Sequence, residues 1–178
     1  MFDWAAAEDG LHRISKKQVV HFLNGAEQDN VYGFGFFCDG YDGTVLLVAN
    51  TKQYHLSSLR DFEARFGPTD PEVFRWDIGN WKYPAGLFPS SSVEQRGFDT
   101  AWNEYREPLS EIENDKNQEM LEDLCSGVLM RLFNEGVFST DSSLMGFTVL
   151  GPDDGQEIVL EKKKRFNGLL QRDGRHKQ

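Results

Sequence analysis

The run of residues 31–50 constrains the fold more strongly than any other stretch of this chain. Phenylalanine crowds its first half, its second half is largely aliphatic, and neither half has the spacing of a helix. Between the halves lie two dipeptides, Asp39-Gly40 and Asp42-Gly43, of the kind that occupies tight turns with positive φ. The run therefore predicts a β-hairpin in which two apolar strands are joined by an acidic turn.

Glycine recurs at alternate positions in the first predicted strand. Gly33 and Gly35 alternate with Tyr32, Phe34 and Phe36. Because successive side chains of a strand point to opposite faces, this pattern leaves one face nearly bare. A bare face allows a helix or another backbone to pack closely against the strand, and we expect such a neighbour here.

Helical spacing of apolar residues predicts helices before the hairpin. Residues 3–13 and 16–26 are predicted as two helices, with Ser15 and Gln18 forming a capping box at the start of the second. The alternative is a single bent helix through residues 4–26. Both arrangements supply an apolar face that can pack on the hairpin.

A further helix is predicted directly after the hairpin, over residues 52–66. Thr51 is placed to cap its start, and Gly67-Pro68 is placed to end it. Its apolar residues recur at helical spacing: Leu56, Leu59, Phe62 and Phe66.

The second half of the chain alternates between aromatic loops and amphipathic segments. The longest predicted helix covers residues 115–135, with Asn114 as its cap and Gly136 as its left-handed terminator. The other predicted elements are a short strand or extended piece at 73–76, an aromatic loop at 77–84, a helix with Phe98, Ala101, Trp102 and Tyr105 on one face, a strand at 144–150 and a short helix at 156–166.

This order of elements predicts an α+β fold. We expect a single domain over residues 1–160, with a small, mostly antiparallel sheet built on the central hairpin at 31–50 and helices packed against it. Residues 161–178 are expected to form a basic, partly flexible C-terminal tail.

Charge is distributed unevenly along the chain. The net charge is −10, yet the tail carries seven Lys and Arg residues, so residues 1–160 are strongly acidic. An acidic body repels phosphate backbones and favours a basic protein partner. The alternative is that the charge serves solubility alone. The tail can bind acidic lipid or nucleic acid, but a solvated terminus is the favoured interpretation, and we expect neither nucleic acid nor membrane as a partner.

The sequence offers little that resembles an active site. The four His and two Cys residues are not spaced as metal ligands, so we expect no metal and no cofactor. Cys38 with His55 is the sole plausible nucleophile pair, but Asp39 and Asp42 beside Cys38 oppose thiolate formation. Cys38 and Cys125 are therefore interpreted as buried hydrophobic residues. No secretory signal and no membrane-spanning segment is evident, which favours the cytoplasm.

Three stretches resemble the bacterial DUF4303 family. They are VYGFGFFCDGYDGTVLLVANT at 31–51, FRWDIGNWKY at 74–83, and LMRLFNEGVF at 129–138, and the resemblance extends over about residues 15–167. Small acidic bacterial proteins of this kind resemble immunity proteins encoded beside polymorphic or contact-dependent toxins. By analogy alone, the resemblance implies a cytoplasmic protein that binds a toxin and is not an enzyme.

The sequence-based hypothesis is thus an immunity protein that occludes a basic toxin. The candidate partner-binding residues are Asp39, Tyr41, Asp42, Asp77, Trp81 and Tyr83, together with the acidic clusters near 111–123. Trp76 and Trp81 have an alternative interpretation as plugs at the edge of the core. The alternative functions are an enzyme of unrecognised type, using Cys38 or a carboxylate, and a small-ligand-binding or scaffold domain.

Overall fold

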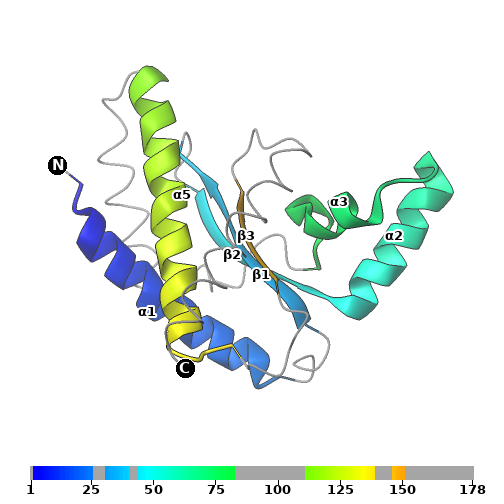
Figure 1. The fold of residues 1–178 in the computed structure, drawn as a ribbon, viewed down its shortest axis with the longest axis horizontal. Coiled ribbons are helices and arrows are strands. Elements are labelled where there is room, and N and C mark those ends of the chain that lie inside the picture. Colours follow the sequence, from blue (N-terminus) through cyan, green and yellow to red (C-terminus); the bar gives the residue numbers. More distant parts are fainter. Residues whose placement is uncertain (1, 26–30, 41–43, 83–110, 139–145, 151–178) are drawn as a thin grey trace, which may run out of the picture.

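A three-stranded sheet forms the centre of the computed structural model (Figure 1). Its strand order is β2-β1-β3, where β1 is Val31–Asp39, β2 is Thr44–Thr51 and β3 is Gly146–Leu150. β1 pairs antiparallel with β2 and parallel with β3. The predicted hairpin and the α+β class are therefore confirmed, and β3 adds a parallel pairing to the antiparallel one. The residues that the structure describes are 2–25, 31–40, 44–82, 111–138 and 146–150.

A shift in register near the start of β1 decides which side chains share a face. Val31 pairs with Thr51, but Gly33 pairs with Asn50, so the ladder is irregular at Tyr32. A bulge of this kind re-aims one side chain relative to strict alternation. Tyr32 accordingly packs in a different apolar cluster from Phe34.

Two helices, α1 (Trp4–Leu23) and α5 (Glu111–Asn134), cover one face of the sheet (Figure 1). The cluster between them and the sheet is mainly aliphatic. From α5 it takes Leu121, Leu124, Cys125, Val128, Leu129 and Leu132, and from the hairpin it takes Phe34, Phe36, Cys38, Val45, Leu47 and Ala49, among others. Both cysteines are free and buried, as expected from the sequence.

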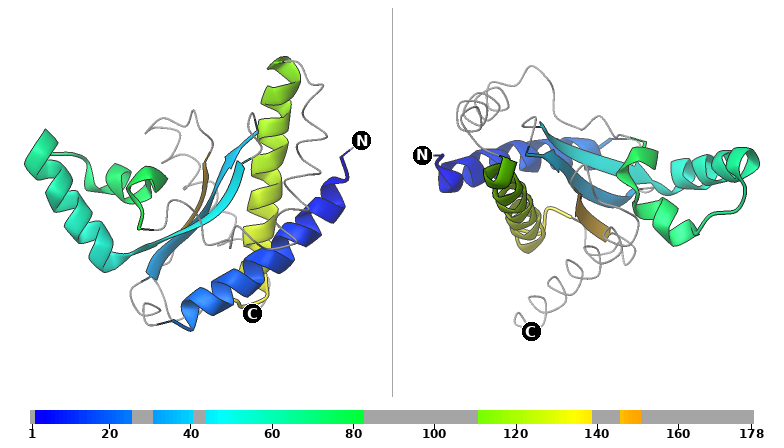
Figure 2. Two further views of the ribbon diagram at one scale, coloured as in Figure 1. Left: turned by 180° about the vertical axis from the view of Figure 1, so that it is seen from behind. Right: turned by 90° about the horizontal axis from the view of Figure 1, so that it is seen from above.

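The short helix α3 (Pro71–Trp76) and the 3-10 helix η2 (Ile78–Asn80) lie on the side of the sheet away from α1 and α5 (Figure 2). The cluster on this face is mainly aromatic and includes Trp76, Ile78 and Trp81. Trp76 and Trp81 lie against β1 at Gly33. A Cβ atom at Gly33 would stand 3.1 Å from the Trp81 ring and 3.4 Å from the Trp76 ring. The close approach predicted for the bare face therefore occurs, and the neighbours are indole rings.

The helix α2 spans Lys52–Phe66, as predicted. Thr51 Oγ1 accepts a hydrogen bond from the Tyr54 backbone N–H at 3.3 Å, and Gly67, with φ of 90°, ends the helix. No residue of α2 is fully buried, and Leu59 and Phe62 are partly buried. In Figure 1 the helix projects from the end of β2 and lies far from α1 and α5.

Several predicted boundaries differ from the observed ones. The N-terminal region is a single helix, which is the alternative interpretation, and Ser15 is fully buried in its middle instead of capping a second helix. The segment 73–76 is helical because Asp70 caps it and Pro71 occupies its first turn. The long helix begins at Glu111, so Asn114 is not its cap.

Other predictions on the second half of the chain have mixed outcomes. Gly136, with φ of 69°, follows α5 in the predicted left-handed conformation. The predicted helices near 98–105 and at 156–166, and the tail at 161–178, lie outside the described residues. None of the helices in the described ranges is long and apolar enough to cross a membrane.

Candidate partner-binding surface

A glutamine on α5 joins the acidic end of the hairpin to the first half of that helix. Gln118 Oε1 accepts a hydrogen bond from the Gly40 backbone N–H at 2.6 Å. Gln118 Nε2 donates to the Cys38 carbonyl oxygen at 3.0 Å and to Glu122 Oε1 at 2.9 Å. One side chain therefore satisfies a donor and an acceptor at the point where β1 ends.

This contact brings together carboxylates that are about eighty positions apart in the sequence. Asp39 ends β1, and the neighbouring half of α5 carries Asp115, Glu119, Glu122 and Asp123. We call these five residues the acidic edge. Asp115, Glu119 and Asp123 are exposed, while Asp39 and Glu122 are partly buried. The sequence indicated the two acidic stretches separately, but it gave no sign that Gln118 connects them.

Along α5 the charged residues of the acidic edge form a continuous row. Asp115, Glu119 and Asp123 are four residues apart, so they lie on the same side of the helix. Like charges at this spacing destabilise a helix by a few tenths of a kcal/mol per pair, about 0.2–0.5 kcal/mol. Lys116, which is also exposed and lies three residues before Glu119, offsets part of this repulsion.

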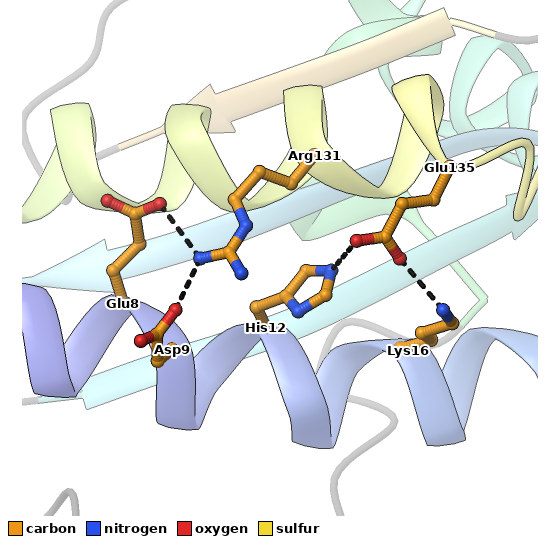
Figure 3. A network of polar contacts seen from close by, with 6 residues as sticks. All are labelled: Glu8, Asp9, His12, Lys16, Arg131 and Glu135. Atoms are coloured by element: carbon orange, nitrogen blue, oxygen red, sulfur yellow. Dashed lines mark hydrogen bonds and ion pairs between the residues drawn. The ribbon is translucent and has the colours of Figure 1, made fainter.

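The second half of α5 and the residue just after it form ion pairs with α1 (Figure 3). Arg131 donates to Glu8 Oε1 at 3.2 Å and to Asp9 Oδ1 at 2.7 Å, both on α1. Glu135, just beyond α5, lies 2.8 Å from Lys16 Nζ and 3.2 Å from His12 Nε2. Acidic side chains at this end are thus paired with cations across the α1–α5 contact.

These ion pairs shift the pKa values of the side chains that form them. The hydrogen bond from Arg131 lowers the pKa of the Asp9 carboxyl group, and the Asp9 carboxylate in turn raises the pKa of Arg131. Lys16 lowers the pKa of Glu135 by donating to its carboxylate. All these groups are solvent-accessible, and exposed ion pairs add little to stability, so the pairs orient α1 on α5 more than they hold it there.

A groove of about 710 Å³ runs along α1 and is basic. Its lining includes Arg13, Lys16, Lys17 and His21. The described surface therefore contains areas of opposite sign on different helices: the acidic edge on α5 and β1, and the basic groove on α1.

Trp81, predicted as a candidate surface anchor, is only 1% exposed. Its Nε1 donates to the Arg75 carbonyl oxygen at 3.0 Å, and the Tyr32 hydroxyl donates to the same oxygen at 2.9 Å. Its ring packs beside Tyr32 and Trp76 in the aromatic cluster. Trp81 therefore plugs the core in this structure, which is the alternative interpretation, and presents no ring surface to a partner.

The aromatic cluster is held by further polar contacts. Asn50 Nδ2 donates to the Tyr32 hydroxyl oxygen at 2.8 Å. The Arg75 guanidinium lies 4.7 Å from the centre of the Tyr32 ring, within the range of a cation–π contact. Burial raises the pKa of the Tyr32 hydroxyl well above its ordinary value, so Tyr32 remains a neutral hydrogen-bonding group.

The remaining predicted residues are placed as follows. Asp77 is exposed and caps η2, because its Oδ1 accepts from the Gly79 N–H at 2.9 Å and its Oδ2 from Asn80 Nδ2 at 2.9 Å. In the sequence it lies between Trp76 and Ile78, which both belong to the aromatic cluster. Tyr41, Asp42 and Tyr83 lie outside the described residues.

The predicted pair of Cys38 and His55 is not assembled. Cys38 is fully buried in the aliphatic cluster beneath α5, whereas His55 on α2 packs its ring 5.6 Å from Tyr32. Burial raises the pKa of the Cys125 thiol, and the neighbouring Cys38 raises it further, so this thiol is protonated and unreactive. Among the residues that the structure describes, no group of three His, Cys, Asp or Glu side chains is arranged to hold a metal ion.

The chain thus belongs to the α+β class and has an acidic edge and a buried aromatic cluster. Comparison with known proteins identifies the family of the chain. Residues 11–168 match the family model described as Domain of unknown function (DUF4303), so the chain belongs to this family. Neither the curated proteins nor the solved structures include a significant match to the chain.

Proposed function

We propose that this chain is a bacterial immunity protein of the cytoplasm, which is not an enzyme and which binds and neutralises a cognate basic toxin. The observation that supports the proposal best is the acidic edge. Asp39 and the carboxylates of α5 are brought together by Gln118, and Asp115, Glu119 and Asp123 form an exposed acidic row on α5.

A surface of one sign acts mainly on the encounter with a partner. It raises the association rate with a basic protein and disfavours acidic partners, while affinity depends more on the desolvated centre of an interface. The acidic edge, and not the basic groove on α1, is therefore the surface that would face a basic toxin. Tyr41 and Asp42, which follow the described end of β1 in the sequence, remain predicted contacts at this edge.

The enzyme alternative has weak support. A nucleophile must reach its substrate, but Cys38 has no exposed surface and lies in a different cluster from His55. A wild-type phenotype for Cys38→Ala would argue further against this alternative.

Binding to the product of the adjacent gene tests the proposal. The edge double variant, Glu119→Gln with Asp123→Asn, removes two carboxylates of the exposed row. We expect its association rate to fall about tenfold and to depend less on salt, because steering by charge is screened by ions. Association rates measured at 50 and 300 mM NaCl would show both effects.

The matched control is Asp61→Asn with Glu63→Gln, which changes the net charge equally but lies on α2. We expect the control to bind like the wild type. If the association rate fell equally in both variants, the effect would come from net charge alone. This result would contradict the acidic edge as the binding surface. An adjacent product that is neither toxic nor bound would overturn the proposal.

A further inference from the structure

The helix α2 exposes an apolar strip that the other described residues do not cover. Leu56 is 53% exposed and Phe66 is 73% exposed, and Leu59 and Phe62 are only partly buried. We call these four residues the α2 strip. Isolated apolar residues on a surface are ordinary, but a contiguous row of large ones marks an interaction site.

The α2 strip is continuous with the core. Phe74 on α3 is 5% exposed, and its ring centre lies 5.2 Å from that of Phe62. The Phe62 ring centre in turn lies 5.0 Å from that of Phe66. The row of three rings therefore runs from the buried side of α3 out to solvent, so Phe66 is held by ring packing.

Charge separates this surface from the acidic edge. Lys52, Arg60 and Arg65 outnumber Asp61 and Glu63 on α2, so the helix carries one net positive charge in a chain of −10. A basic toxin is not complementary to such a helix. A second copy is complementary, because each α2 offers both signs beside its strip.

The order of charges along the helix fits a symmetric contact. At helical spacing, Arg60 and Glu63 border one side of the α2 strip, and Arg65 borders the other. In a twofold contact the same patch occurs on both copies, so Glu63 of one copy can face an arginine of the other.

We propose that the α2 strip is the interface of a homodimer in which two α2 helices pack against each other about a twofold axis. A 15-residue helix is about 22 Å long, so one helix face buries less than the roughly 800 Å² per partner of a standard interface. The dimer is therefore weak, with a dissociation constant on the order of 10–100 μM.

Sedimentation equilibrium of the full chain, without any toxin, tests the dimer over about 2–500 μM. We expect the wild-type mass to rise from one copy to two across this range. Phe66→Glu places a charge on the most exposed residue of the α2 strip and is expected to keep the chain monomeric throughout. Because Phe66 is exposed, the melting temperature should change little, which shows that the variant is folded.

The matched control is Val20→Glu, which also exchanges an exposed apolar residue for a glutamate, on α1. We expect it to dimerise like the wild type. A wild-type chain that remains monomeric at 500 μM would overturn the proposal. The α2 strip would then bind another protein or another part of the same chain. Dimerisation of Phe66→Glu equal to that of the wild type would overturn it as well.

Salt distinguishes the α2 contact from a contact between the acidic edge and the basic groove of a second copy. An apolar contact persists at 0.5 M NaCl, whereas a contact between exposed charges is screened. Loss of the dimer at this salt concentration would contradict the α2 strip as its interface. These measurements are independent of the proposed function, because no toxin is present.

Discussion

The helices α5 and α2 both have apolar residues at helical spacing, but they differ in how many of these residues are buried. α5 buries Leu121, Leu124, Cys125, Val128, Leu129 and Leu132, whereas α2 buries none of its residues. Helical spacing of apolar residues thus indicates that a helix forms and which side is apolar. It does not indicate what covers that side, and in α2 the structure leaves much of it open.

The difference arises from how each helix meets the sheet. α5 lies beside α1 across the face that presents Phe34, Phe36 and Cys38 (Figure 1). α2 follows β2 directly, capped by Thr51, and leads away from the strand end. It contacts the aromatic cluster through His55, and α3 through Phe62.

The largest expected effect contrasts leucines on the two helices. Leu129→Ala removes a fully buried side chain beneath α5 and should lower the free energy of unfolding by about 2–5 kcal/mol. Leu56→Ala on α2 should change it by less than about 0.5 kcal/mol. Urea denaturation at a concentration where the chain is monomeric measures both. Equal losses would show that α2 packs more fully than the structure indicates.

A smaller effect is expected for the glutamine that joins the hairpin to α5. Gln118→Ala leaves the buried Gly40 N–H and the Cys38 carbonyl oxygen without this partner, which should cost about 1–3 kcal/mol. Gln53→Ala, at an exposed position of α2, is the matched control and should be nearly neutral. The measurement is the urea midpoint of each variant. An unchanged midpoint in Gln118→Ala would show that the hydrogen bonds of Gln118 to the hairpin do not stabilise the fold.

The smallest expected effect concerns pH and His55, the residue through which α2 contacts Tyr32. Burial lowers the pKa of His55 from 6.5, so the unfolded chain binds this proton more readily than the folded chain. Stability from His55 is therefore fully present above about pH 6.5 and is lost as the pH falls toward the lowered pKa. The lowered pKa values of Asp9 and Glu135 act at more acidic pH, below their ordinary values of 3.8 and 4.5.

His55→Phe should accordingly flatten the decline of stability between about pH 6.5 and 5. The measurement is the urea midpoint at several pH values, with His21→Phe on the exposed side of α1 as the control. If the decline of stability persisted in His55→Phe but disappeared in His21→Phe, it would arise from His21 on α1, and the prediction for His55 would be wrong.

Local signals account for the parts of the fold that were predictable. The hairpin was indicated by its Asp-Gly dipeptides, α2 by its flanking Thr51 and Gly67, and the end of α5 by Gly136. Each signal concerns the conformation of a few neighbouring residues, which the sequence expresses directly.

Features that depend on distant contacts were not predictable in the same way. The helix α3 was interpreted as extended, although Asp70 and Pro71 are a cap and a first-turn residue. Trp81 is a candidate anchor because tryptophan favours interfaces, but it is buried against Gly33 of β1, which is distant in the sequence. The acidic edge likewise required the Gln118 contact between segments about eighty residues apart.

The two exposed surfaces should have separate roles, and protection from the toxin tests this most directly. The chain would be co-expressed with the product of the adjacent gene, and growth would be measured for the wild type, the edge double variant and Leu56→Glu with Phe66→Glu. We predict that the wild type and the α2 variant restore growth, while the edge double variant protects poorly. Full protection by the edge double variant, with loss of protection in the α2 variant, would contradict the account.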